Sequence, residues 1–564
     1  MALSGVAAGA LLALLWVVFA IPELSHHGLA IDSPSLFYAG DRTLFWLEHP
    51  GHPEALDFTY PAPEPAGFHS AFFPFPDKND PRHYPVFAGL VAAASAQATA
   101  HFGFSPIDGH HLGLVLLHAV GLVCFTVLAF RVFGARVGLL ASAFLLCFPA
   151  AVGQAFNNAK DWPCADFYAC ALLASIEALV VRRPGAARTA GLFAGVALSC
   201  KLNGVFALAC IGLLGLVALW QRSRAKGALD LSAARDLALI FALAGCVFFV
   251  LWPYLYHGPI SGWPGHVEDY LQWYLAYGRS PRASWTDYPL RSLMFATPPL
   301  VLLCALASAP VIARARGAQL TTLLFVLGWI AVPILRTAVP HSNFYDGNRH
   351  FLEYIPGLCV LAAVGADWAR AQISARLPAA AAEAGRLVLA FVFVLLLALP
   401  LSLYRPFEGT YFNFLIGGLG GAQSRALFDV PAPHDARVKG TEGDYWYGNL
   451  GDGLPHLKAL LAPGQGVALC GPAPQQLQLS WPEGAPLLRQ HATDADVLYV
   501  SPREVFCGLG LVRLLEAARP VLYRAERGGG LVYEILGAAD GTAHPVLTAP
   551  SAYEADRRNF GTVW

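Results

Sequence analysis

Long apolar segments recur along the chain, and they constrain its fold more than any other feature. A helix that crosses a bilayer needs about 20 largely apolar residues. With 56% hydrophobic and 13% charged residues, the chain also has too little charge to cover a soluble globule of 564 residues. The sequence therefore predicts a polytopic α-helical membrane protein with about 11 transmembrane helices. The runs lie near 2–21, 110–130, 136–155, 163–181, 188–200, 203–220, 237–256, 290–312, 319–337, 351–369 and 387–404.

Basic residues between the apolar runs indicate how the chain is threaded, because cytoplasmic loops carry an excess of Lys and Arg. The short segment 86–100 decides the sidedness: if it lies in the membrane interface, every basic cluster falls on one side. We therefore predict a cytoplasmic N-terminus, an interfacial helix at 86–100, and an outer location for everything after Tyr404. The run at 2–21 lacks the basic residues of a signal peptide, so we expect a retained helix. The clusters contain Arg131, Arg136, Arg182, Arg183, Arg188, Arg222, Arg224, Lys226, Arg235, Arg314, Arg316, Arg370, Arg376 and Arg386.

The segment 22–85, between the first apolar run and the interfacial helix, is the predicted first outer loop. It is rich in carboxylates and histidines and also contains many aromatic residues. Connections this long are usually functional or disordered, and the aromatic content argues against disorder. We predict a folded lid or platform that brings carboxylates to the membrane surface.

From residue 405 onward the pattern becomes that of a small α/β domain. This divides the chain into a transmembrane domain, 1–404, and an extracytoplasmic domain, 405–564. Three consecutive glycines at 528–530 indicate a hairpin turn. Whether Cys470 and Cys507 form a disulfide stays open. The predicted strands are 466–470, 496–501, 521–523 and 531–536, and the predicted helices are 454–461 and 511–518.

Four polar clusters border the apolar runs on the predicted outer side, at 156–163, 199–204, 257–287 and 341–350. Ionisable groups at helix ends are costly to bury and are functional candidates, although Lys and Arg near an interface also snorkel. We favour binding over snorkelling for Lys201, which has only a short polar break around it. For Arg349 and His350, which follow Asp346, ligand contact and internal pairing both remain open.

Acidic groups on a lid and cationic groups at helix ends suit one kind of reaction. A lipid phosphate leaving group needs fixed positive charge, which Arg and Lys supply. An incoming hydroxyl needs a carboxylate base within hydrogen-bond reach. Together these groups predict transfer of a group from a lipid phosphate to an acceptor outside the membrane.

Three motifs give the chain a resemblance to a known family. They are Asn-Asn-Ala-Lys-Asp at 157–161, Tyr-Asp-Gly-Asn-Arg-His-Phe-Leu at 345–352, and Tyr-Phe-Asn-Phe-Leu-Ile-Gly-Gly-Leu-Gly-Gly-Ala at 411–422. In combination they resemble a bacterial subgroup of glycosyltransferase family 39, the GT-C-fold family of protein O-mannosyltransferases and the lipid A aminoarabinose transferase. The resemblance implies a polyprenyl-phosphate sugar donor and inverting transfer to a protein, lipid or glycan acceptor. It also implies a location in the bacterial plasma (inner) membrane.

The same resemblance implies roles for individual residues. Asp32, shortly after the first helix, corresponds to the family's catalytic base, and His83 begins the motif that opens the interfacial helix. His266 lies in a loop from which a relative supplies a metal ligand. The residues expected at the donor are Arg349, His350, Lys201, Lys160, Asp161 and His83, with Asp41, His266, Asp346 and Tyr345 as possible supporting residues.

The sequence departs from the family pattern at three places. Residues 429–443 look inserted ahead of Asp444-Tyr445-Trp446, which in relatives follows the Gly-Gly stretch more directly. Ser33 follows Asp32 where many relatives have Glu, so a second carboxylate is either missing or supplied by Asp41 or Glu48. Tyr84 replaces a proline. A divalent metal also stays an open question: His266, Glu268 and Asp269 have ligand chemistry, but such a trio in a loop is more often solvated.

Two other classes of function remain as alternatives. A transporter or flippase of lipid-linked sugars would use the same cationic helix ends without a base, although inverted repeats and broken midplane helices are not evident. A non-catalytic homologue that binds a lipid-linked sugar fits the missing Glu. Nucleic-acid binding is not expected, because the net charge is -1 and no basic surface is evident.

Overall fold

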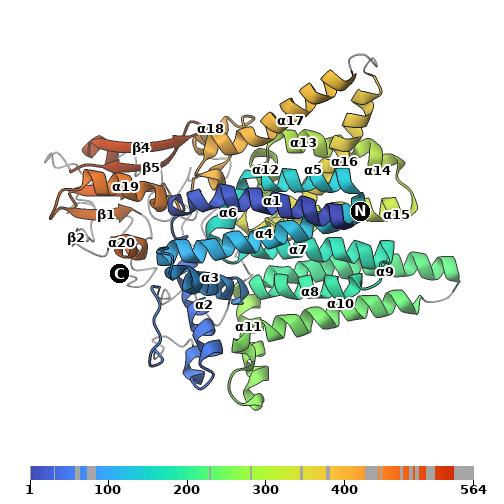
Figure 1. Cartoon of the computed structure of the whole chain (residues 1–564), viewed down its shortest axis with the longest axis horizontal. Coiled ribbons are helices and arrows are strands. Elements are labelled where there is room, and N and C mark those ends of the chain that lie inside the picture. The colour runs from blue at the N-terminus through green and yellow to red at the C-terminus, as the bar shows by residue number, and fades with distance from the viewer. Residues whose placement is uncertain are drawn as a thin grey trace.

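The computed structural model shows a bundle of long helices with a small sheet at one end (Figure 1). The predicted fold class, a polytopic helical membrane protein with a small C-terminal α/β unit, is confirmed. In Figure 1 the start of α1 and the sheet lie at opposite ends of the bundle. The described residues are 2–30, 32–57, 64–72, 84–227, 230–277, 279, 282–342, 347–376, 382–425, 443–444, 448–470, 474–481, 487–489, 495–502 and 515–538.

The bundle is built from helices of unequal length. They are α1 (Ala2–Glu23), α4 (Pro106–Phe133), α5 (Ala135–Leu146), α6 (Pro149–Asn157), α7 (Asp161–Ile176), α8 (Ala186–Cys200), α9 (Val205–Lys226), α10 (Leu231–Val250), α12 (Tyr288–Phe295), α13 (Pro299–Leu306), α14 (Ala309–Arg314), α15 (Gly317–Ala338), α16 (Tyr354–Ser374) and α17 (Ala382–Tyr404). The chain also contains a π-helix, η4 (Glu177–Val181), and several short 3-10 helices: η1 (Leu24–His26), η2 (Pro53–Leu56), η5 (Leu202–Gly204), η6 (Pro253–Tyr256), η7 (Ile260–Gly262), η8 (Arg349–Phe351) and η10 (Glu408–Thr410).

Every predicted apolar run coincides with a helix or a bent pair of helices. Within the described ranges, six helices are long and apolar enough to cross a membrane, or up to eight if each bent pair is one span. The runs at 136–155 and 290–312, expected as straight spans, are bent by 63° and 105°. The cause is proline: Pro149 begins α6 and Pro299 begins α13, and the residue before a proline avoids the helical conformation. The runs at 188–200, 351–369 and 387–404 coincide with α8, α16 and α17.

Three of the basic residues that the sequence placed on one side have acidic partners at one end of the helices. Arg131, at the end of α4, and Arg183 both pair with Glu177, at 3.9 and 3.2 Å. Arg182 pairs with Asp230 at 3.8 Å, just before α10. These contacts place the loops together. That this end faces the cytoplasm remains a prediction.

Two helices that follow α1 in the chain pack beside the bundle: α2 (Ser33–Glu48), within the predicted outer loop 22–85, and α3 (Phe87–Ala100), after it. α3 coincides with the predicted interfacial helix 86–100 and packs on α2 and α4. The α2 and α3 backbones touch at two glycines: a Cβ on Gly40 would lie 2.2 Å from the Gly89 carbonyl oxygen. α2 is therefore seated on α3 with no room for a side chain between them.

The C-terminal unit contains α18 (Gly418–Arg425), α19 (Leu450–Leu460), α20 (Pro474–Ser480) and a five-stranded sheet in the order β2-β1-β3-β5-β4. β1 pairs in parallel with both β2 and β3, whereas β5 runs antiparallel to β3 and β4. The predicted hairpin at 528–530 joins the last two strands. The strands are β1 (Gly466–Cys470), β2 (Leu487–Leu488), β3 (Val497–Val500), β4 (Val521–Arg527) and β5 (Gly530–Leu536).

The predicted helix 454–461 coincides with α19. Of the predicted helix 511–518, only residues 515–518 belong to the described part of the chain, and they are helical. The question of a disulfide between Cys470 and Cys507 lies outside the described side chains.

A buried carboxyl group lies where the bundle joins the C-terminal unit. Glu408, in η10 after α17, is 1% exposed, and η10 packs against α6. Arg405 nearby forms an ion pair with Glu23. Burial raises the pKa of Glu408 to about 7, and the negative charge of Glu23 acts in the same direction. The folded protein therefore favours the protonated carboxyl group.

We expect Gly40→Ala to lower the free energy of unfolding by about 1–3 kcal/mol, because the added methyl group must push α2 away from α3. Gly245→Ala, in α10, is the matched control, since nothing lies within 4 Å of a Cβ there. Thermal unfolding in detergent measures both. A Gly40→Ala protein as stable as wild type would show that the glycine contact does not seat α2.

We expect Glu408→Gln to change how stability depends on pH. The pKa of Glu408 is higher in the folded than in the unfolded chain, so its contribution is complete below about pH 4.5 and is lost as the pH rises towards 7. The wild type should therefore lose about 2 kcal/mol relative to Glu408→Gln between pH 5 and pH 7. Parallel pH profiles of the two melting temperatures would contradict this.

Candidate active site

The turn between α6 and α7 is built by the asparagines of the 157–161 motif. The Asn158 side-chain oxygen accepts hydrogen bonds from the backbone N–H groups of Lys160 and Asp161, at 3.2 and 2.8 Å. Such local bonds are the reason Asn favours turns and helix starts. Asp161 begins α7, where the helix dipole favours a negative charge. The turn thus fixes Lys160 and Asp161 side by side.

Asp32 lies directly opposite this turn, at the N-cap of α2. Its Oδ2 atom accepts from Lys160 Nζ at 2.5 Å and from Arg349 Nη1 at 3.2 Å. The side chain of Ser33, the next residue, donates to the Asn157 backbone oxygen at 2.9 Å. Lys160 Nζ also lies 4.5 Å from the centre of the Tyr84 ring. The start of α2 and the 157–161 turn are therefore joined by an ion pair and by a hydrogen bond to the backbone.

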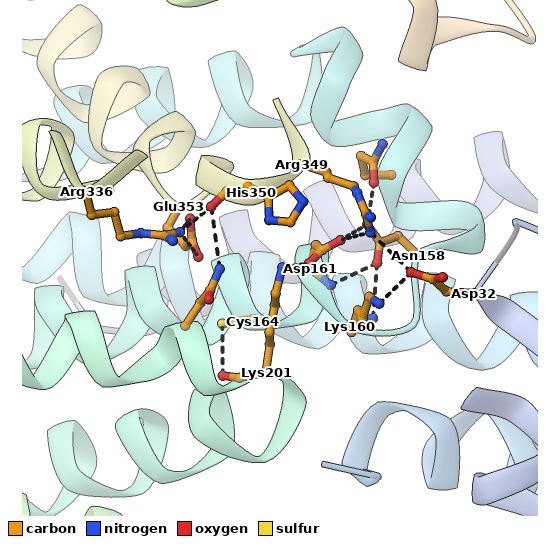
Figure 2. Close-up of polar contacts among 12 residues, drawn as sticks. Asp32, Asn158, Lys160, Asp161, Cys164, Lys201, Arg336, Arg349, His350 and Glu353 are labelled. Atoms are coloured by element: carbon orange, nitrogen blue, oxygen red, sulfur yellow. Dashed lines mark hydrogen bonds and ion pairs between the residues drawn. The ribbon is translucent and has the colours of Figure 1, made fainter. Parts of the chain in front are cut away.

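Asp161 joins the second half of the cluster. It pairs with Lys201, which follows α8, and Arg349 Nη1 lies 3.8 Å from its other carboxylate oxygen. Arg349 stands in η8, after Gly347, whose φ of +67° favours glycine. Figure 2 shows Arg349 reaching both Asp161 and Asp32. Asp161 is 2% exposed and Arg349 4% exposed, so these charges neutralise one another away from water.

Two further charged residues, which the sequence reasoning missed, extend the cluster. Arg336, near the end of α15, makes 3.1 Å hydrogen bonds to both carboxylate oxygens of Glu353 and also donates to the His350 backbone oxygen. Trp329 donates its indole N–H to the Glu353 backbone oxygen at 2.7 Å. A signal existed: both charges lie inside predicted apolar runs, where an ionisable residue is a functional candidate.

A cavity of about 340 Å³ opens beside the cluster. Four cationic side chains line it: Lys160, Lys201, Arg336 and Arg349. Among the described residues, the carboxylates that pair with these cations are Asp32, Asp161 and Glu353. The remaining wall is largely aromatic or apolar: Tyr84, Pro85, Leu202, Phe206, Tyr270, Trp273, Tyr274, Val339 and Pro340. The cavity thus combines the chemistry of an anion site with that of a lipid or sugar site.

His350 also lines the cavity and is mostly buried. Burial, reinforced by the positive charges of Arg349 and Lys201, lowers the pKa of His350 well below its usual range. The imidazole is therefore neutral near pH 7. As a neutral ring it adds a hydrogen-bonding group to the cavity without adding charge.

The structure brings together Asp32, Lys160, Asp161, Lys201, Arg349 and His350, all expected from the sequence. Three other candidates, His83, Tyr345 and Asp346, lie outside the described residues. The supporting residues are engaged elsewhere. Asp41 accepts from Ser70 at 2.5 Å and pairs with His110 at 2.9 Å, and His266 stacks on His257 and Tyr254.

No group of three or more His, Cys, Asp or Glu side chains in the described ranges is arranged to hold a metal ion. Of the trio 266, 268 and 269, Glu268 accepts a hydrogen bond from Gln272 at 3.0 Å. Whether the protein needs a metal therefore stays the open question that the sequence left.

No protein-family model matches the sequence, and no curated protein matches it. Solved structures do show a likeness. A crystal structure of ArnT from Cupriavidus metallidurans in the apo state is 16% identical, covers 93% of this chain and 97% of that one, and gives a TM-score of 0.46. The same protein bound to undecaprenyl phosphate is 17% identical, covers 95% and 98%, and gives 0.44.

The archaeal oligosaccharyltransferase AglB from Archaeoglobus fulgidus, in complex with an inhibitory peptide and a dolichol-phosphate, is 12% identical. It covers 97% of this chain and 75% of that chain, with a TM-score of 0.45. Likenesses this distant decide nothing about a substrate or a reaction.

Proposed function

We propose that the chain is a membrane glycosyltransferase that moves a sugar from a polyprenyl phosphate to an acceptor on the extracytoplasmic side, with inversion at the anomeric carbon. Asp32 is the general base. Arg349, Lys201, Lys160 and His350 hold the donor phosphate, and Asp161 holds the cations in place. The acceptor is a hydroxyl of a protein, lipid or glycan, and the enzyme belongs to the bacterial plasma membrane.

One observation carries the proposal: the Asp32 carboxylate shares its cations with the wall of the cavity. Lys160 and Arg349 both contact Asp32 and both line the cavity. A phosphate bound there would lie beside the base, which is the arrangement that a displacement at a phosphate-linked carbon needs. The cavity's aromatic wall suits a sugar ring or a prenyl chain.

In the proposed step, the acceptor hydroxyl gives its proton to Asp32 while its oxygen bonds to the anomeric carbon. The bond between that carbon and the phosphate oxygen breaks, and its electron pair leaves with the polyprenyl phosphate. The phosphate gains one negative charge as Asp32 loses one, so the charge of the site as a whole does not change. Arg349 and the lysines stabilise the charge on the leaving oxygen.

Donor binding also draws two cations away from the Asp32 carboxylate, the proposed base. Without a donor, Lys160 and Arg349 are paired with the Asp32 carboxylate. A phosphate that enters the cavity competes for the same two cations, because its oxygens, like those of a carboxylate, accept charge-assisted hydrogen bonds from Arg and Lys. The Asp32 Oδ2 atom that held these cations can then accept from the acceptor hydroxyl, which favours binding of the donor before the acceptor.

We expect Asp32→Asn to lower the release of free polyprenyl phosphate by about 10²–10⁴-fold, while binding of polyprenyl phosphate persists. The measurement uses purified protein, a panel of polyprenyl-phosphate sugars and an acceptor extract. Asp41→Asn is the matched control, since Asp41 is another carboxylate of the same segment that pairs with a histidine. Wild-type release rates in Asp32→Asn would eliminate Asp32 as the base, and donor translocation without release would favour a flippase.

We expect Arg349→Ala to weaken binding of polyprenyl phosphate by about tenfold or more, because a charge-assisted contact to the phosphate is lost. Arg291→Ala is the control: Arg291 pairs with Asp287 on α12 and does not line the cavity. Titration of both proteins with polyprenyl phosphate measures the change. Equal affinities for the two variants would place the phosphate site elsewhere.

A further inference from the structure

We propose that the C-terminal domain positions the catalytic base, and that Gln476 is the residue through which it does so. This inference rests on the proposed function, in which Asp32 is the base. Asp32 follows a non-helical stretch, residues 27–30, that lies between η1 and α2. That stretch is held by the C-terminal domain on one side and by the 157–161 turn on the other.

The first observation is a pair of hydrogen bonds across the domain boundary. The Leu29 backbone N–H donates to the Gln476 side-chain oxygen at 2.9 Å, and both residues are buried. The Gly28 N–H donates to the Gly448 backbone oxygen at 2.6 Å. Two successive N–H groups of the stretch thus have their partners in a part of the chain more than 400 residues away.

The second observation is how closely the two backbones approach. A Cβ on Gly28 would lie 2.4 Å from the Gln476 side-chain oxygen, and a Cβ on Gly451 would lie 2.7 Å from the Gly28 nitrogen. Such distances leave no room for any side chain at either position. The contact therefore requires glycine on both sides, at Gly28 and at Gly451. A domain attached only by a tether would pack more loosely.

The third observation is that the opposite face of the stretch rests on the site itself. Asn157 donates from its side chain to the Gly28 backbone oxygen at 3.4 Å, and its backbone oxygen accepts from Ser33. A Cβ on Gly448 would lie 2.5 Å from the Asn157 amide nitrogen. Domain, base-bearing stretch and phosphate-binding turn are therefore stacked in direct contact.

Two polar contacts of Asp452 add to the junction between the C-terminal domain and the stretch. His26 Nδ1 lies 2.9 Å from one Asp452 oxygen, and Tyr533 of β5 donates to the other at 2.8 Å. Figure 1 shows α19 and α20 at the end of the bundle where α1 finishes. The sheet thereby supports α19, and α19 supports the stretch before Asp32. Small displacements of a reacting group lower turnover strongly, so the support has a catalytic consequence.

The test compares Gln476→Met, which removes the acceptor, with Gln476→Glu, which keeps one. Gln423→Met is the matched control, because Gln423 bonds the backbone of Leu531 in β5 and does not touch the stretch. Gly28→Ala disturbs the same contact from the other side and decides the matter if Gln476→Met does not fold. The readouts are amide hydrogen exchange of the Leu29 region, kcat for sugar transfer, and affinity for polyprenyl phosphate.

We expect Gln476→Met and Gly28→Ala to exchange the Leu29 amide about tenfold faster and to lower kcat about tenfold or more. Affinity for polyprenyl phosphate should stay within about twofold, since the cations are untouched. Gln476→Glu should restore much of the protection and turnover, and Gln423→Met should change neither.

Unchanged exchange in Gln476→Met overturns the inference whatever the activity shows. Faster exchange with wild-type kcat overturns it too, because the contact would then be structural only. A loss of donor affinity equal to the loss of kcat would likewise assign the effect to the site as a whole. If the wild type itself transfers no sugar, the proposed function fails, and the exchange data still decide whether Gln476 holds the stretch.

Discussion

Charges withdrawn from water at the ends of helices must be paired, and this constraint organises the protein. Removing one partner of a buried ion pair typically costs about 3–5 kcal/mol. Here Asp32 and Asp161 stand between Lys160, Lys201 and Arg349, so each charge has at least one opposite neighbour. Pairing of these charges fixes the elements that carry them relative to one another. These elements are α2, the 157–161 turn, the end of α8 and η8.

The same pairing links structure to the proposed chemistry. Without a ligand, the cations of the site are paired with the site's own carboxylates. When a phosphate binds, the same cations can pair with the phosphate oxygens instead. Arg336 and Glu353 form a similar buried ion pair on the other side of His350. The proposed base and phosphate site thus belong to one network, and the C-terminal unit reaches it through the backbone of residues 28 and 29, just before Asp32.

Sequence reasoning reached the helices, the hairpin and most of the charged cluster because each leaves a local trace. Apolar runs, three successive glycines and the 157–161 motif can be recognised from neighbours in the chain. The prolines Pro149 and Pro299 are a local trace of the two bends, but both runs were expected to be straight spans. Arg336 and Glu353 were hidden inside apolar runs. The Leu29–Gln476 contact has no local trace at all, since 447 positions separate its partners and only the fold brings them together.

The central claim is that one cluster serves both the base and the donor phosphate, and a structure of the protein with bound polyprenyl phosphate tests it most directly. The account predicts the phosphate in the cavity beside His350, in contact with Arg349 and Lys160, with both cations turned from Asp32 towards the phosphate oxygens. A phosphate bound outside this cavity, or one that leaves both cations on Asp32, would contradict the account.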